Sequence, residues 1–538
     1  MYKWFDDTVV DLGRQFRLSY LPPLMIYLAA GVSGLTAIVG TFFVKEYLGL
    51  SAAFLAGLGF WAGIPWALKM PLGHLVDVIW RWKSALVYLG AAMLASSIVI
   101  MYALIVHTGA MTEFMNVEAW FVLSALLAPS GYVVQDVVAD ALTVEAVPLV
   151  DDNGQPYAES EVKLMHTTVQ TLGRFAVVSG LVFVSVLNIV MFSGVEQLSE
   201  VDKASVYANI YLLALVIPVI SIFGVILGDV LSRRRAHKLR RQGFDAAQIS
   251  NMLSQDVPTT RPDWWILGGG LAFVIFTLLV GLTGVPGAQE IIFLGSMGIV
   301  LALMYRLLLA LQPQARNALI GTAVIIFAFR AVPLPGAGAT WFEIDVLGFD
   351  QQFLSVLSLI TACLALAGML ALRPLMARRS IVWLIAALTI ASGLLSLPNI
   401  GLYFGVHEWT ASWSGGVIDA HFIAILDTAI ESPLGQISMI PMLAWIAKNA
   451  PAHLKATFFA VMASFTNLAL SASSLATKYL NEVFVVTRQV VDRVTGAVQV
   501  AADYSQLGWL LIVVAVIVVA LPLFTIAVVQ SSSLRTRE

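Results

Sequence analysis

Apolar runs of about 20 residues recur along this chain, and they limit its fold more than any other feature. A helix needs about 20 apolar residues to cross the roughly 30 Å hydrocarbon core of a bilayer. Charged residues make up 12% of the chain, whereas a soluble domain carries about 25%. The chain therefore lacks the polar surface of a water-soluble globule. We expect an all-α membrane protein whose surroundings are the lipid bilayer.

The apolar runs predict about fourteen spans in three groups. Six runs lie in the first 231 residues, two lie near 264–311, and six lie between about 316 and 530. The predicted domains are an N-terminal six-helix bundle (1–231), a basic cytoplasmic linker (232–262), an additional transmembrane helix pair (263–312) and a C-terminal six-helix bundle (313–538).

The distribution of Lys and Arg orients these spans, because basic residues avoid translocated loops. With both termini in the cytoplasm, the inside loops and termini hold 21 basic residues and the outside loops hold 4. The basic run SRRRAHKLRRQ then lies in a cytoplasmic linker, where it contacts anionic lipid rather than nucleic acid. We therefore expect a multi-pass protein of the plasma membrane, of the bacterial inner-membrane type. The first 19 residues have no apolar core, so we expect no cleavable signal peptide.

Motifs of catalysis and of metal binding are missing from the sequence. The single cysteine, Cys363, excludes a disulfide framework and a thiolate metal cluster. The histidines are scattered, and no GxSxG, Walker or HExxH pattern occurs. We therefore expect neither an enzyme nor a bound cofactor or metal.

Ionisable residues within the fourth and fifth spans are functional candidates, because each is costly in lipid unless it is paired or wet. Asp136 and Asp140 are four residues apart and share a helix face. Gln170 and Arg174 have the same spacing on the next span. Residue counts place Asp136 and Arg174 at a similar depth, so we expect them to pair, with Asp140 as a neighbour that can titrate. The alternative is that these pairs fix helix packing and have no further role.

The twelfth span repeats this pattern with Asp427 and Glu431. Pro433 and Pro441 interrupt the span, as is typical of discontinuous helices at transporter sites. Arg330, near the outer end of the ninth span, is a candidate partner for these acids. A buried carboxylate without a dedicated counter-charge can carry a proton.

The loop after the second span reads KMPLGHLVDVIWRWKS and resembles the signature of the major facilitator superfamily. Its glycine permits close helix approach, and its aspartate can cap a helix or pair with the basic residues. The candidate cytoplasmic gate consists of Gly73, Asp77, Arg81 and Lys83.

Longer stretches resemble one branch of that superfamily, the folate-biopterin transporter family. They include QDVVADALTVEAVP and TVQTLGRF in the first half, and ESPLGQISMIPMLAW and APAHLKATFFAVMASFTNLAL in the second, in the family's order. The resemblance implies a major facilitator fold of two pseudo-symmetric six-helix bundles, alternating access, and uptake of folates or pterins with protons. On that template, motif positions fall at Lys45, Trp66, Lys69, Asp77, Asp136, Asp140, Arg174 and Asn467.

Two departures from the family pattern keep other functions open. The helix pair near 264–311 is additional, and the loop reads IWRWK where the family usually has Gly-Tyr-Arg-Arg. Muropeptide permeases share a similar fourth span, as do membrane proteins that help to assemble light-harvesting complexes. A carrier of another solute, such as a muropeptide or a drug, and a non-transporting assembly factor are therefore the alternatives.

The expected partners are protons and a small organic anion of the folate or pterin class. Aromatic walls suit pterin rings, and cationic side chains suit glutamate tails. The proton-coupling and ion-pair candidates are Asp136, Asp140, Arg174, Asp427 and Glu431. The substrate-binding candidates are Trp66, Lys69, Gln170, Arg330 and Asn467.

Overall fold

The computed structural model is all-helical in its described residues, apart from one small hairpin. It describes residue 13 and residues 15–48, 50–148, 150–151, 155–245, 248–249, 262–283, 285–309, 312–371, 379–435, 455–491 and 498–535. Among them, ten helical stretches are long and apolar enough to cross a membrane. Helices lie at every predicted apolar run, the twelfth being described as far as Gly435. An all-α membrane protein is therefore confirmed, whereas the number of spans and the side of the termini stay predictions.

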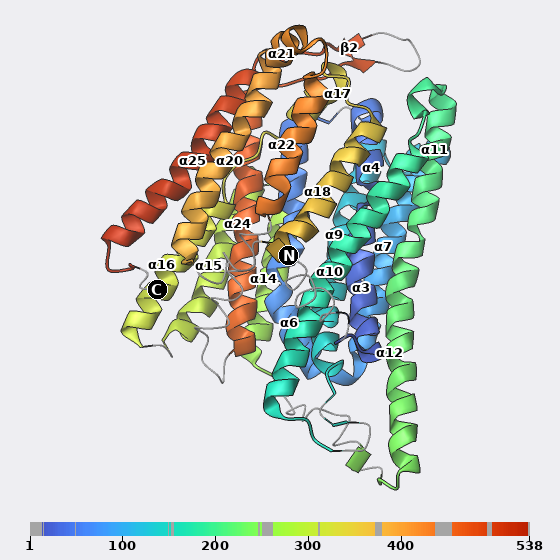
Figure 1. Cartoon of the computed structure of the whole chain (residues 1–538), viewed down its shortest axis with the longest axis vertical. Coiled ribbons are helices and arrows are strands. Elements are labelled where there is room, and N and C mark those ends of the chain that lie inside the picture. Colours follow the sequence, from blue (N-terminus) through green and yellow to red (C-terminus); the bar gives the residue numbers. More distant parts are fainter. Residues whose placement is uncertain are drawn as a thin grey trace.

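The first half of the chain forms one group of helices (Figure 1). Two of its spans are divided, the first by a 3-10 turn and the second at Leu68. The helices are α3 (Leu21–Val32), α4 (Ala37–Tyr47), α5 (Ala52–Ala67), α6 (Lys69–Val78), α7 (Lys83–Val106), α9 (Val117–Glu145), α10 (Glu159–Met191), α11 (Glu200–Ala214) and α12 (Val216–Arg241). Short connections are η2 (Leu18–Tyr20), η3 (Ser33–Thr36), η4 (Trp80–Trp82), α8 (Thr108–Thr112) and η5 (Val195–Gln197).

The second half forms a similar group beside the first (Figure 1). Its ninth predicted span is one helix, and a short helix that was not predicted follows it. The helices are α16 (Pro313–Arg330), α17 (Ala337–Asp345), α18 (Gln351–Ala371), α20 (Ile381–Tyr403), α21 (Val406–Ser414), α22 (Ala420–Gly435), α24 (Lys455–Val483) and α25 (Leu507–Ser531). The hairpin strands β1 (Val490–Val491) and β2 (Val498–Val500) lie just before α25.

Glycines let the helices of the first half approach closely, as small residues do in membrane bundles. A Cβ atom on Gly31 of α3 would lie 2.0 Å from the carbonyl oxygen of Val177 on α10. A Cβ atom on Gly90 of α7 would lie 2.6 Å from the carbonyl oxygen of Gly131 on α9. A side chain at either position would force these helices apart.

The two halves meet along two helix pairs. Helix α5 packs on α24, and helix α10 packs on α18. Small residues line the first seam: a Cβ atom on Gly59 would lie 3.6 Å from Ser474 Oγ. The second seam is apolar and includes Val178 against Ala362 and Ala365. Any motion of one half relative to the other must therefore slide α5 along α24 and α10 along α18, or separate the helices of each pair.

The additional helices, α14 (Trp264–Leu282) and α15 (Ala288–Leu308), flank the α5–α24 seam. Gln289 Nε2 donates to the carbonyl oxygen of Gly57 on α5 at 3.1 Å. The next residue, Glu290, accepts from Lys478 Nζ on α24 at 3.2 Å and also from the Tyr479 hydroxyl. Successive residues of α15 thus bind opposite halves of the molecule.

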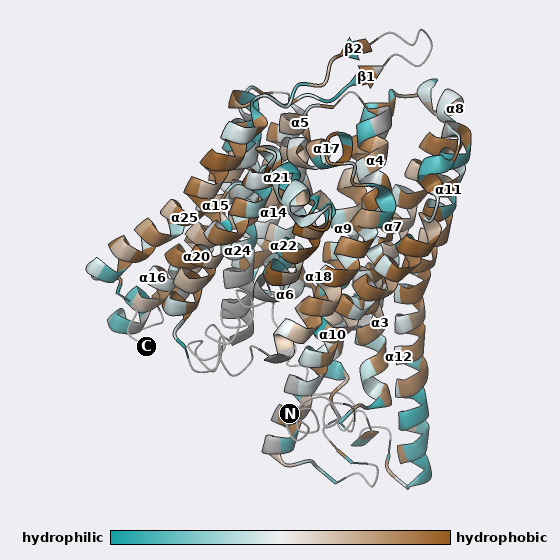
Figure 2. Cartoon of the chain, turned by 45° about the horizontal axis from the view of Figure 1, so that its top comes forward, coloured by the Kyte–Doolittle hydropathy of each residue, from teal (hydrophilic) through white to brown (hydrophobic). Residues whose placement is uncertain are grey.

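The hydropathy of the residues along the helices follows the pattern that a bilayer requires (Figure 2). Apolar residues cover the middle of the helices, and polar residues gather towards their ends, most clearly at the C-terminal end of α12. That end carries Lys238, Arg240 and Arg241 in its last turn. The basic segment predicted as a linker therefore begins as a continuation of α12 beyond its apolar part.

Candidate functional site

The central feature of the first half is an ion-paired cluster of Lys69, Asp136 and Asp140. Lys69 Nζ lies 2.6 Å from Asp136 Oδ2 and 2.9 Å from Asp140 Oδ2. The Tyr27 hydroxyl donates to the other oxygen of Asp140 at 2.6 Å. The three charged side chains are between 22% and 42% exposed, so the cluster is neither dry nor open to bulk water.

Local sequence explains how these groups meet. Asp136 and Asp140 are one turn apart on α9 and therefore face the same way. Pro65 lies near the end of α5, and the helix is interrupted at Leu68, immediately before Lys69. Lys69 therefore opens a new helix, α6, which packs against α9.

The ion pair differs from the one we predicted. We expected Asp136 to pair with Arg174, but its partner is Lys69. Arg174 lies within electrostatic range of Asp136; its side chain is exposed, and the described residues give it no ion pair. Counting residues from the ends of the two spans gave the depths of Asp136 and Arg174. The count did not include the break at Leu68, which places Lys69 closer to Asp136 than Arg174 is.

Gln170 of α10 lies next to this cluster. Its Nε2 donates to Thr143 Oγ1 at 2.8 Å, and the Thr143 hydroxyl donates to the carbonyl oxygen of Asp140 at 2.6 Å. The amide of Gln170 is thus connected to the cluster through one side chain.

A cavity of about 210 Å³ adjoins the cluster. Aromatic and polar side chains share its wall: it is lined by Ile26, Tyr27, Ala30, Ser33, Trp66, Tyr132, Gln135 and Asp136. The divided first span supplies one side of this cavity, α9 another and the end of α5 a third.

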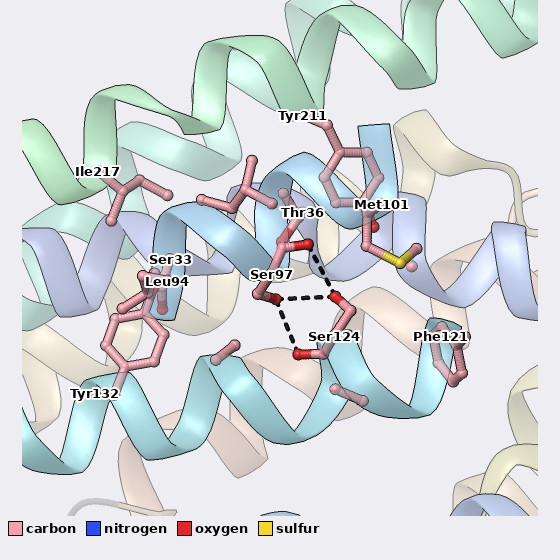
Figure 3. A pocket seen from close by; sticks show the side chains of 14 residues that line it. Ser33, Thr36, Leu94, Ser97, Met101, Phe121, Ser124, Tyr132, Tyr211 and Ile217 are labelled. Atoms are coloured by element: carbon pink, nitrogen blue, oxygen red, sulfur yellow. Dashed lines mark hydrogen bonds between the residues drawn. The ribbon is translucent and has the colours of Figure 1, made fainter. Parts of the chain in front are cut away.

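A second cavity of about 200 Å³ shares Ser33 and Tyr132 with the first. Figure 3 shows its hydroxyl-rich wall between Tyr132 at one end and Phe121 and Met101 at the other. Ser97 and Ser124 exchange hydrogen bonds with each other's carbonyl oxygens at 2.9 and 3.0 Å. Among the described residues, no charged side chain lines this second cavity, whereas Asp136 lines the first.

Trp66 and Asn467 come together across the seam between the halves. Asn467 Nδ2, on α24, donates to the backbone carbonyl of Trp66 on α5 at 3.2 Å. Two predicted substrate-binding residues from opposite halves are therefore in contact, and Trp66 lies three residues before Lys69 in the sequence.

The acids of the second half form a separate group. Asp427 is 7% exposed, and its Oδ2 accepts from Asn399 Nδ2 at 3.2 Å, while its Oδ1 has no partner among the described residues. Glu431 lies one turn further along α22 and is exposed. Arg330, our candidate partner, makes no ion pair within the part of the chain that the structure describes. The predicted break at Pro441 lies outside the described residues.

Glu343 of α17 belongs with these acids, and the sequence analysis did not single it out. It interacts electrostatically with Asp427. Its position in TWFEID, after the Pro- and Gly-rich PLPGAGA segment that follows the ninth predicted span, is the signal that could have identified it.

The candidate cytoplasmic gate is brought together in part. Gly73 and Asp77 lie on α6, where Asp77 is exposed. Lys83 lies 3.0 Å from Glu145 at the end of α9 and stacks over the Trp80 ring at 4.3 Å. The side chain of Arg81 lies outside the described residues. Lys83 therefore pairs with the fourth span, and not with Asp77 as the motif alone suggests.

At the opposite end of the molecule, contacts that the sequence analysis missed join the two halves. Lys45 Nζ on α4 lies 2.5 Å from Asp345 Oδ1 on α17, and the Tyr504 hydroxyl donates to Asp345 Oδ2 at 2.6 Å. Burial and this hydrogen bond raise the pKa of Tyr504, so it stays a donor at neutral pH.

Arg488 adds a second link between the halves at the same end. It is 3% exposed, donates to the carbonyl oxygen of Val44 at 2.5 Å, and stacks over the Trp341 ring at 4.9 Å. Burial lowers the pKa of Arg488 to about 10, which leaves it charged at neutral pH. We call Lys45, Asp345, Arg488 and Tyr504 the outer contact.

Comparison with known proteins gives one family and one type of fold. The model of a family described as the BT1 family matches residues 196–534. A "Folate-biopterin transporter" of Synechocystis sp. is 23% identical over 486 residues, which are 89% of this chain and 78% of that protein. A POT family transporter in complex with 5-aminolevulinic acid aligns with a TM-score of 0.62 and 13% identity over 96% of each chain.

The nucleoside transporter NupG aligns with a TM-score of 0.55 and 12% identity, over 95% of this chain and 99% of that one. At such identities the likeness to solved structures shows the fold alone. The relatives and structural neighbours are membrane transporters, not enzymes.

Proposed function

This chain belongs to the BT1 family, and from that premise we propose that it moves folate- or pterin-like organic anions across the plasma membrane, by alternating access and with protons. The kinship with folate-biopterin transporters expected from the sequence is confirmed by the curated relative. That the chain is a membrane transporter follows from the family and the fold. The substrate, the protons and the plasma membrane are the proposal.

The observation that carries the proposal is the cluster of Lys69, Asp136 and Asp140 beside a cavity. Two carboxylates share one ammonium group, so the fully ionised cluster has a surplus negative charge. An organic anion is repelled by that charge until a proton neutralises one carboxylate. The proton also weakens the hold on Lys69 Nζ, which can then bind the anion. Binding of the proton and of the anion thus favour each other.

The contacts between the halves support alternating access. The outer contact holds that end closed, while the Trp66–Asn467 hydrogen bond joins the halves beside the cluster. In a carrier, opening of the outer end requires Lys45 to leave Asp345 and α5 to move relative to α24. Substrate that reaches Lys69 would then be exposed to one side of the membrane at a time.

We expect cells that express the chain to accumulate labelled folate or a labelled pterin when a proton gradient is present. A protonophore should reduce uptake to the level of cells that carry the empty vector, because the solute then has no driving force. Uptake by filtration over minutes measures this. Accumulation that survives the protonophore would remove proton coupling. Absence of uptake across a folate and pterin panel, in cells whose membranes contain the protein, would remove this substrate class in favour of another solute.

A further inference from the structure

The additional helices α14 and α15 take no part in the function proposed above, but two consecutive residues of α15 bind both halves of the molecule. Gln289 Nε2 donates to the carbonyl oxygen of Gly57 on α5 at 3.1 Å. Glu290 Oε1 lies 3.2 Å from Lys478 Nζ on α24 and also accepts from the Tyr479 hydroxyl. We call these contacts of Gln289 and Glu290 the α15 clamp.

The α15 clamp lies towards the same end of the α5–α24 seam as the outer contact. Gly57 is near the start of α5, which follows Lys45 after a short loop. Lys478 is near the end of α24, which leads to Arg488. If the outer end opens by separation of α5 from α24, one of the two sides of the clamp must therefore release.

The two sides of the clamp differ in strength. Towards α24, Glu290 and Lys478 form an ion pair whose side chains are 28% and 22% exposed, and hydrogen bonds between charged groups are stronger than those between neutral groups. Towards α5, Gln289 makes one neutral hydrogen bond. Helix α15 also packs more extensively on α24 than on α5. The bond to Gly57 should therefore release first, and α15 should move with α24.

Helix α14 is attached to the first half at the end of the pair that lies away from the clamp. The backbone N–H of Asp263 donates to His74 Nε2 on α6 at 2.8 Å. A Cβ atom on Gly270 would lie 2.4 Å from Pro71 Cβ, so α14 packs closely on α6. The first half therefore holds the pair through α14, and the second half holds it mainly through α15.

We propose that the additional helix pair restrains opening of the outer end: anchored on α6 and α24, it binds Gly57 through Gln289 and thereby holds α5 against α24. Release of this hydrogen bond then belongs to the step in which the outer end opens. The inference rests on the alternating access of the proposed function, but on no particular substrate. A pair that only filled space beside the seam would not change the rate of that step.

The test measures opening at two cysteine reporters in the full-length chain, each introduced after Cys363→Ser. Ser474→Cys lies on the α5–α24 seam, close to the clamp. Ser355→Cys lies on α18, which packs on α10 and α22 rather than on α15. Ser355 is 0% exposed and lies one turn after Gln351, whose amide donates to the Tyr207 hydroxyl of the first half. A membrane-impermeant maleimide reaches either reporter faster when the outer end opens more often.

We expect Gln289→Leu to accelerate labelling at both reporters by about 2- to 12-fold, the population change that corresponds to the net contribution of one neutral hydrogen bond. Gly57→Ala disturbs the same contact from α5, because a Cβ atom there would lie 3.0 Å from Gln289 Nε2, and it should accelerate labelling as well. Gln312→Leu, which removes an exposed glutamine before α16, is the matched control and should leave both rates unchanged.

Thermal unfolding shows which variants keep the wild-type midpoint, and the two substitutions act from different helices, so damage by one leaves the other as the measurement. Faster labelling at the Ser474 position alone would overturn the inference, because it would indicate local loosening of the seam. Faster labelling at both positions, without transport of folate or pterin under any gradient, would keep the clamp and remove the proposed function. Folate transport with labelling unaffected by Gln289→Leu and by Gly57→Ala would do the reverse.

Discussion

Lys69→Met is expected to abolish accumulative uptake, with a loss on the order of a hundredfold. The substitution leaves Asp136 and Asp140 facing each other without the ammonium group that lies 2.6 and 2.9 Å from them. Breaking a fully buried pair costs about 3–5 kcal/mol. Because these side chains are 22–42% exposed, we expect a smaller loss of about 1–2 kcal/mol in the free energy of unfolding. Uptake and the thermal midpoint measure the two effects.

Two further variants make the Lys69 result interpretable. Lys238→Met removes a lysine from the last turn of α12 and should change neither quantity. Lys69→Met combined with Asp140→Asn restores the original net charge of the cluster, so it should recover most of the stability but not the uptake. A double variant that transports like the wild type would show that Lys69 serves packing alone.

Lys45→Glu is expected to open the outer end of the molecule. It places a negative charge against Asp345, where Lys45 Nζ now lies at 2.5 Å, and like charges at an interface cost several kcal/mol. A cysteine at Ser474, on the α5–α24 seam, reports the opening when the native Cys363 is replaced by serine. Its labelling by a membrane-impermeant maleimide should accelerate by roughly tenfold or more, since each 1.4 kcal/mol changes a population ratio tenfold.

Charge exchange provides the control for the outer contact. Lys45→Glu with Asp345→Lys rebuilds an ion pair of opposite polarity and should return labelling towards the rate of the parent. The hydrogen bond from Tyr504 is lost in this exchange, so recovery should be incomplete. Equal labelling rates in all three proteins would mean that this ion pair does not hold the outer end closed.

The helical architecture could be predicted from the sequence because it depends on local properties. Runs of about 20 apolar residues and the asymmetry of basic loops are set by the bilayer, whatever the tertiary contacts. Each predicted run contains a helix in the structure. Residue counts also placed Asp136 and Arg174 at a similar depth, since position along a helix converts directly into depth, and the two lie within electrostatic range of each other.

The partners within the site depend on features that residue counts do not capture. Lys69 meets Asp136 because the second span breaks at Leu68, and a count that assumes one straight helix places Lys69 near the cytoplasmic end. Pro65 was the available signal for that break. The outer contact joins residues far apart in the sequence, such as Lys45 with Asp345 and Arg488 with Val44. No local pattern specifies such pairs.

In the second half, too, residue spacing alone did not predict the surroundings of the acidic side chains. The spacing of Asp427 and Glu431 suggested a shared role, but Asp427 is buried against Asn399 whereas Glu431 is exposed. Their difference arises from the packing of α22 on α18 and α20. A four-residue spacing puts two side chains on one face of a helix. The neighbouring helices, however, determine whether each of these side chains is buried or exposed.

Comparison of accumulation with exchange in proteoliposomes tests the central claim most directly. Purified wild-type protein should accumulate labelled folate or pterin above the external concentration when an inward proton gradient is imposed. Asp140→Asn removes one of the two carboxylates that share Lys69, so it should lose this accumulation while still exchanging internal for external substrate. Accumulation by Asp140→Asn at the wild-type level would contradict the assignment of proton coupling to this cluster.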